Sequence, residues 1–208
     1  MPINQPKYNN LFSSLIWIGL IGFVMLFLLA SSYYPGGSNN DPNSLGYDWS
    51  KNYWSELLGY NAKNGHRNPS RPFGIGGAIA FAFSMSVFWI YIPLKLELNQ
   101  LAKRSIQWFG LLAMVCSVLI FGQSHDVFIT LSVTFGSIAF LMMLVGLWQS
   151  KQLVLFWWCC LCLILILLNT FIYMSGWWID TLPVLQKITF ACGICWTAYT
   201  TLVLNTHS

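Results

Sequence analysis

The sequence predicts an all-α protein, a polytopic transmembrane bundle of six helices. Two observations support this prediction. The 208-residue chain is 56% hydrophobic and only 8% charged, whereas soluble domains have about 25% charged residues. Six windows also offer about 20 residues without a charge near the centre, the length that crosses a hydrocarbon core about 30 Å thick. We therefore expect one transmembrane domain that covers residues 1–208.

The predicted spans follow one another along the chain, most of them separated by short polar turns. They cover about residues 11–32, 73–92, 105–122, 127–148, 153–174 and 182–204. The first window is too long for a secretory signal, whose apolar core has about 7 to 15 residues, so we expect it to be retained as a span. Six spans place both termini on the same side of the membrane.

The lysines and arginines of the short loops indicate the orientation, because cytoplasmic loops carry an excess of positive residues. The second and fourth loops hold four such residues, against at most one in the third and fifth. We therefore expect both termini in the cytoplasm. The long first loop, residues 33–72, is then extracytoplasmic.

The middle of this first loop carries aromatic and apolar residues at roughly helical spacing. These are Trp49, Tyr53, Trp54, Leu57 and Leu58. The spacing predicts a short interfacial helix over about residues 48–58, with Asp48 or Ser50 as its N-cap and Gly59 as its stop. Aromatic rings are favoured at headgroup depth, so we expect the helix to lie as a lid over the bundle.

The polar residues near the expected spans gather toward the extracytoplasmic face. An ionisable group inside hydrocarbon costs about 2.5 to 3.5 kcal/mol on insertion scales, so the positions of such groups carry functional information. We predict a polar pocket at this face that binds a lipid headgroup or a small amphiphile, with membrane lipids as the partners. The predicted ligand-binding residues are Asn52, Trp54, Arg71, His125, Asp126, Asn169 and Lys187.

Two other functions fit part of the same pattern. A membrane-embedded lipid hydrolase or transferase could use Ser55, Glu56, His125 and Asp126, since a nucleophile needs a positioned base. A small-solute exporter is the second alternative, although the spans lack a charged relay at their centres. Helix capping and interfacial anchoring explain the same residues without any ligand. No complete catalytic set is visible, which favours a binding protein over an enzyme.

Composition and spacing also exclude several classes of protein. The net charge of +4 is small and scattered through the loops, whereas nucleic-acid binding needs a clustered basic face. The six cysteines lie in apolar runs and do not indicate a disulfide framework. His207 is expected on the opposite side from His66 and His125, so a three-histidine zinc site is excluded. We expect no metal and no cofactor.

Residues 52–59 (NYWSELLG) and 68–73 (NPSRPF), together with the polar turn 123–126, resemble an uncharacterised family of small six-helix bacterial integral membrane proteins. This resemblance implies a bacterial inner membrane. More distantly, the layout is similar to membrane hydrolases of the alkaline ceramidase and progestin-receptor type, whose sites use Ser, Asp and three His. Gln186 and Lys187 stand where the final span of that type has a His-x-x-x-His pair, so its metal and its reaction are not carried over.

Overall fold

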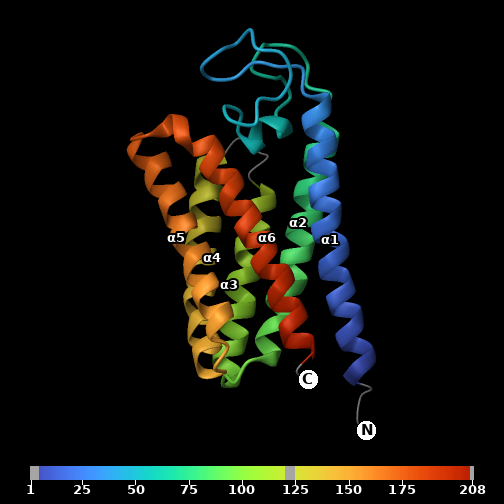
Figure 1. Cartoon of the computed structure of the whole chain (residues 1–208), viewed down its shortest axis with the longest axis vertical. Helices are drawn as coiled ribbons and strands as arrows, with labels where there is room; N and C mark the ends of the chain where they lie inside the picture. The colour runs from blue at the N-terminus through green and yellow to red at the C-terminus, as the bar shows by residue number, and fades with distance from the viewer. Residues whose placement is uncertain (1–4, 120–124, 207–208) are drawn as a thin grey trace.

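The computed structural model describes residues 5–119 and 125–206, with side chains from Asn10 to Leu119 and from Asp126 to Thr206. This described part contains six long α-helices and no strand beyond isolated bridges. The long helices are α1 (Gln5–Tyr33), α2 (Arg71–Tyr91), α3 (Gln100–Leu119), α4 (His125–Gln149), α5 (Leu153–Ser175) and α6 (Leu182–Thr206). The first begins and the last ends at the same end of the bundle (Figure 1).

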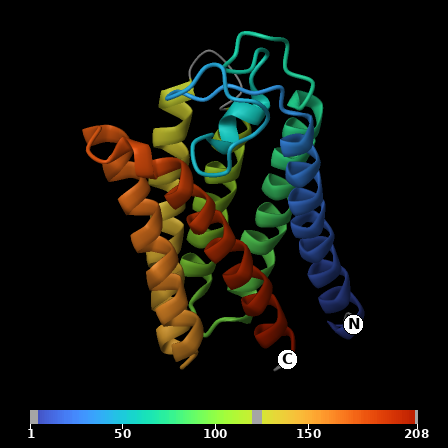
Figure 2. The ribbon, with the colours of Figure 1, turned by 45° about the horizontal axis from the view of Figure 1, so that its top comes forward.

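The helices form a closed ring. Each helix packs against the next along the chain, and α6 returns to contact α1. The loop between α1 and α2 lies across one end of the bundle (Figure 2). We call this end the loop face, and the end where α1 begins the terminal face.

Five helical segments are long and apolar enough to cross a membrane. They are Asn10–Tyr33, Arg71–Lys95, Asp126–Gln149, Leu153–Ser175 and Ile179–Thr206. The third predicted span, 105–122, corresponds to α3, which begins five residues earlier at Gln100. Its described part is less apolar than the other helices because Lys103 and Arg104 lie in its first turns. The end of this span and most of the turn 123–126 lie outside the described residues.

The half of the bundle nearer the terminal face is packed with aromatic rings. Trp196 of α6 is fully buried, and its ring centroid lies 5.3 Å from those of Phe88 in α2 and Phe140 in α4. Its Nε1 donates a hydrogen bond to the carbonyl oxygen of Leu155 in α5 at 3.1 Å. One side chain therefore joins four helices.

Small residues let neighbouring helices approach closely, as expected where helices associate without a hydrophobic drive from water. A Cβ atom on Gly110 of α3 would lie 2.3 Å from Cγ of Trp89 in α2, so only glycine fits there. On the other side of α2, the Ser84 hydroxyl donates to the Ile16 carbonyl of α1 at 2.7 Å. These contacts fix α2 between α1 and α3.

Of the helix predicted over residues 48–58, only the second half forms, as the short 3-10 helix η1 (Trp54–Leu58). Asp48 and Asn52 explain the difference, because their side chains bond the backbone locally in place of a helical ladder. The Asp48 carboxylate accepts from the Ser50 backbone N–H at 2.8 Å, and the Asp48 N–H donates to Oδ1 of Asn52 at 2.8 Å. The chain therefore makes a turn before η1.

Candidate functional site

The loop face is covered by residues 34–70, whose η1 packs onto α1, α2 and α6. Its early and late parts pass close to each other. Gly37 has a φ of +82°, and a Cβ atom there would lie 2.3 Å from the backbone nitrogen of Asn64. The Asn64 N–H donates to the Gly36 carbonyl at 3.2 Å, and the Lys63 N–H donates to the Tyr34 hydroxyl at 3.0 Å. The loop is thus a folded layer joined to itself.

Asn52 is the centre of this layer and is fully buried. Its Nδ2 donates to the Gly37 carbonyl at 2.7 Å and to Oε2 of Glu56 at 2.5 Å. Its side-chain Oδ1 accepts from the Asp48 N–H. Its backbone carbonyl accepts from Nζ of Lys187 at 2.6 Å. Both polar groups of the side chain are therefore occupied within the protein, which gives Asn52 the role of holding the loop.

Glu56 places a carboxylate inside the same layer, with a side chain only 7% exposed. Its Oε1 lies 3.8 Å from Nζ of Lys63 and has no hydrogen-bond partner among the described residues. Burial raises the pKa of Glu56, partly offset by the Asn52 hydrogen bond and the charges of Lys63 and Lys187. Burial and the nearby Glu56 also raise the pKa of Tyr47. The protonated form of Glu56 is thus favoured relative to an exposed glutamate.

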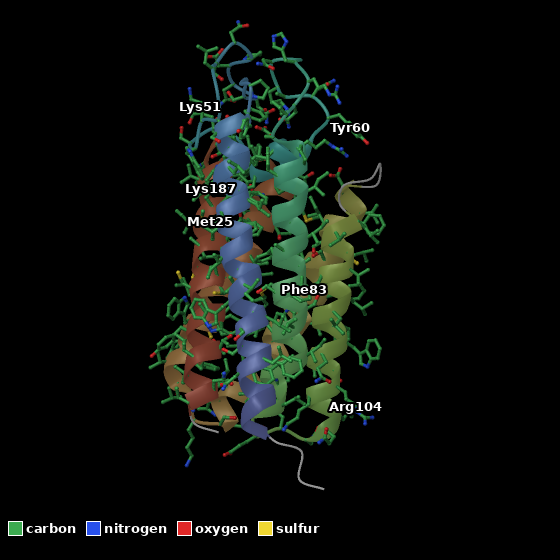
Figure 3. The ribbon with its side chains drawn as sticks, turned by 90° about the vertical axis from the view of Figure 1, so that its right-hand side faces the viewer. Met25, Lys51, Tyr60, Phe83, Arg104 and Lys187 are labelled. Carbon is green, nitrogen blue, oxygen red and sulfur yellow. The ribbon has the colours of Figure 1, made fainter. Side chains whose placement is uncertain are left out.

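Lys187 reaches the loop from α6. Its Nζ donates to the Asn52 carbonyl at 2.6 Å and to the Pro183 carbonyl at 3.0 Å, and it lies 5.4 Å from the centroid of the Tyr47 ring. Figure 3 shows Lys187 directly below the loop layer. The structure therefore brings two predicted ligand-binding residues, Asn52 and Lys187, into direct contact.

Trp54, a third predicted ligand-binding residue, turns toward the bundle. Its ring stacks with Phe27 at 4.6 Å, Phe23 at 5.2 Å and Phe190 at 5.2 Å between centroids. Its backbone N–H donates to Oε1 of Gln186 at 3.1 Å, and its buried Nε1 has no hydrogen-bond partner among the described residues. The indole therefore fills the space between α1 and α6, whereas the sequence predicted a headgroup position.

Arg71 begins α2 on the other side of the loop. Its guanidinium carbon lies 3.8 Å from the centroid of the Tyr60 ring, a cation–π contact. The preceding segment is fixed by Asn68, whose Nδ2 donates to the carbonyls of Glu56 at 3.1 Å and Gly59 at 3.0 Å. These bonds tie the end of the loop to η1.

The remaining predicted ligand-binding residues lie on α4 and α5, and two of them form hydrogen bonds to a neighbouring helix. Asp126 of α4 accepts from the Tyr173 hydroxyl of α5 at 2.7 Å, and Nδ2 of Asn169 in α5 donates to the Thr189 hydroxyl of α6 at 2.6 Å. His125 begins α4, but its side chain lies outside the described residues. The contacts of Asp126 and Asn169 therefore join neighbouring helices.

Two of the four predicted catalytic residues, Ser55 and Glu56, are adjacent on η1. The Glu56 carboxylate contacts Asn52 and Lys63, and Asp126 accepts from Tyr173. Within residues 5–119 and 125–206, no group of three or more His, Cys, Asp or Glu residues could hold a metal ion.

A cleft lies where the loop meets the start of α6, and it is lined by none of the predicted ligand-binding residues whose side chains the structure describes. It has a volume of about 80 Å³ and is lined by Asn39, Asn40, Lys51, Tyr53, Ile179, Asp180 and Pro183. Nδ2 of Asn40 donates to the Asp180 carboxylate at 3.3 Å, and the Tyr53 hydroxyl donates to the Ile179 carbonyl at 3.4 Å. The cleft therefore combines one positive and one negative side chain, Lys51 and Asp180.

From the sequence, Asp180 is one of the polar groups expected at this face, although a helix cap explains it as well. The neighbouring residues Trp177 and Trp178 could have indicated this site from the sequence, and in the structure they are 69% and 73% exposed. Trp178 also has a φ of +55°, a left-handed conformation that is uncommon for a bulky residue. Exposed tryptophans are enriched at the membrane–water interface. Asp180 follows closely along the chain, so a charged group is expected at the same depth.

Comparisons of the chain with protein-family models, curated proteins and solved structures find no match. The resemblance to six-helix bacterial membrane proteins therefore stays a prediction. The geometry of the loop face is the basis for inferring a function.

Proposed function

We propose that this protein is a multi-pass membrane protein that binds the zwitterionic headgroup of a phospholipid in the loop-face cleft. The presence of Lys51 and Asp180 in one cleft is the observation on which the proposal rests. A zwitterionic headgroup carries a phosphate and an ammonium, so each charge of the cleft has a partner. Lys51 lies 3.9 Å from the Asp48 carboxylate, an exposed pair of the kind worth about 1 kcal/mol or less. That weak pair leaves Lys51 available to a phosphate.

The size of the cleft suits the charged end of a headgroup. Its volume of about 80 Å³ equals the share of two to three water molecules at about 30 Å³ each. A whole lipid does not fit, so the acyl chains stay outside the cleft. The proposed complex is therefore a lipid held at its head.

The surroundings of the cleft favour contact with the rest of a lipid. Trp177 and Trp178 are exposed beside it, and Phe171 and Met174 of α5 are 54% and 75% exposed. Five helices long and apolar enough to cross a membrane support burial of this α5 surface in hydrocarbon. The acyl chains would then run along α5 below the tryptophans.

The folded loop layer around Asn52 holds one side of the cleft in a fixed conformation. Tyr53 lines the cleft and follows Asn52, whose side-chain bonds and contact with Lys187 fix the local backbone. A binding surface that is ordered before the ligand arrives loses less conformational entropy on binding. Asn52 and Lys187 thus support binding without touching the ligand.

The proposal is tested by native mass spectrometry of the detergent-purified protein titrated with phosphatidylethanolamine. Asp180→Asn and Lys51→Gln are each expected to weaken binding about fivefold, the effect of about 1 kcal/mol per charge at a membrane surface. Asp41→Asn and Arg67→Gln remove exposed charges from the same loop outside the cleft. These controls should change binding by less than about twofold.

Phosphatidylglycerol lacks the ammonium, so its binding should not be weakened by Asp180→Asn, whereas phosphatidylethanolamine binding should fall. Cleft variants that behave like the controls, or an Asp180→Asn variant that weakens binding of the two lipids equally, would refute the cleft as the binding site. Release of a free headgroup or a lyso-lipid during the incubation would instead favour the lipid hydrolase predicted as the alternative.

A further inference from the structure

A second and larger groove lies between α2 and α3, away from the loop. Its volume is about 350 Å³, and Ile90, Arg104, Gln107, Trp108 and Leu111 line it. Ligand pockets in proteins have volumes of about 300 to 1,000 Å³. Figure 3 shows Arg104 at the end of the bundle opposite the loop. The groove therefore lies at the terminal face.

The polar end of the groove is held in place by contacts between the two helices. Nε2 of Gln107 donates to the Ile90 carbonyl at 2.8 Å, so the amide bridges α3 to α2. Arg104 and Trp108 are four residues apart on α3 and share one face of the helix. An exposed guanidinium thus lies one turn from an indole that is 66% exposed.

The charge of the terminal face is complementary to an anion. Its two turns, residues 92–104 and 149–152, contain four basic residues and one acidic residue. The basic residues are Lys95, Lys103, Arg104 and Lys151, and the acidic residue is Glu97. Nζ of Lys103 donates to the Leu94 carbonyl at 3.2 Å, whereas Arg104 lines the groove.

An apolar track continues from the groove toward the middle of the bundle. On α3, Leu112, Val115 and Leu119 are 41%, 57% and 46% exposed, and on α2 Phe83 is 49% exposed. These α3 residues recur at intervals of three and four after Trp108, so they continue the same helix face. Figure 3 shows Phe83 on this side of the bundle, farther from the terminal face than Arg104.

We propose that the α2–α3 groove binds an anionic phospholipid, with its phosphate at Arg104 and its acyl chains along the α3 track. A basic group, an interfacial indole and an apolar track follow one another in the order of the parts of such a lipid. The site is separate from the loop-face cleft, and the inference rests only on membrane embedding of the bundle. It adds a second lipid, with a net negative headgroup, at the opposite face.

The test is native mass spectrometry of the detergent-purified protein with dioleoyl phosphatidylglycerol and dioleoyl phosphatidylcholine as probes. We expect Arg104→Gln to weaken phosphatidylglycerol binding about fivefold and to leave phosphatidylcholine binding unchanged. Arg104→Lys, which keeps the charge, should retain the preference for phosphatidylglycerol. Lys151→Gln is the matched control, because it removes a positive charge from the same face outside the groove.

The Arg104→Gln protein should still bind phosphatidylethanolamine as the wild type does, so failure here is distinguishable from failure of the loop-face cleft. Equal effects of Arg104→Gln and Lys151→Gln would overturn the proposal, since the preference would then be a property of the whole face. Competition by glycerol 1-phosphate as effective as by the lipid would also overturn it, because the acyl track would then contribute nothing.

Discussion

Among the residues that the structure describes, rings pack at both ends of the bundle, but only the loop face adds a buried hydrogen-bonded layer. Near the terminal face, buried rings such as Trp196, Phe88 and Phe140 pack across four helices. At the loop face, Asn52 and Lys187 join segments 135 residues apart by hydrogen bonds to a buried polar layer. The hydrophobic burial of rings is non-directional, whereas a buried hydrogen-bond network is costly when only partly satisfied. The helices and the loop should therefore fail separately, and each of the following variants tests that separation.

The largest effect is expected for Trp196→Ala, which removes a fully buried ring from the terminal half. Truncation of a buried tryptophan costs about 3 to 5 kcal/mol, measured as the free energy of unfolding in an SDS titration of the detergent-solubilised protein. Trp157→Ala is the control, since that ring is 66% exposed. An equal loss for both variants would show that ring packing does not hold the bundle together.

Asn52→Ala should open the loop while the helices stay folded. The substitution leaves the Gly37 carbonyl and the Glu56 carboxylate without the Asn52 donor, and each buried group left unpaired costs about 1 to 3 kcal/mol. Hydrogen exchange should increase across residues 34–70 and remain unchanged in α3 to α5. Asn43→Ala, at an exposed position of the same loop, is the control. Exchange that rises throughout the chain would contradict independent failure of the two ends.

Lys187→Met should have a smaller effect of the same kind. It removes the ammonium that bonds the Asn52 and Pro183 carbonyls, and a buried carbonyl left without a donor costs about 1 to 3 kcal/mol. The Tyr47 hydroxyl still donates to the Asn52 carbonyl at 3.2 Å, so part of that loss is compensated. We expect faster exchange at residues 47–54 with Lys151→Met as control. Unchanged exchange there would show that α6 does not hold the loop.

The smallest effect is the pH dependence of the loop. Because the pKa of Glu56 is raised by burial, the folded loop favours the neutral acid. Its contribution to stability is present in acid and is lost as the pH rises through the raised pKa. Protection of residues 34–70, corrected for intrinsic exchange, should be greater at pH 5 than at pH 8, and Glu56→Gln should remove this difference. A loop that loses protection in acid would contradict the direction of the shift.

The helices could be predicted from the sequence because length and apolar composition determine them locally. The predicted spans and the observed helices agree to within a few residues at most ends. The starts of α1 and α3 are the exceptions, since α1 begins six residues early at Gln5 and α3 begins five residues early and extends through Lys103 and Arg104. Five of the helical segments are apolar enough to cross a membrane, which supports the predicted class of protein.

The loop-face site could be predicted only in part. The polar character of Asn52 and Lys187 was visible in the sequence, but their mutual contact joins positions 135 residues apart. The inward turn of Trp54 depends on Phe23, Phe27 and Phe190, which lie on other helices. No local pattern encodes such contacts. For the same reason, the sequence spacing of Lys51 and Asp180 could not show that both residues line one cleft.

The most direct test of the central claim exchanges the two charges of the cleft. Phosphatidylethanolamine affinity is measured for Lys51→Glu, for Asp180→Lys and for the double variant. Each single exchange places two like charges in the cleft and should abolish most of the binding. Our account predicts that the double variant regains part of the lost affinity, because one charge of each sign again stands in the cleft, while the phosphate that carries the acyl chains must then lie at the opposite side of the cleft. A double variant as weak as the two losses combined would contradict a headgroup bound between Lys51 and Asp180.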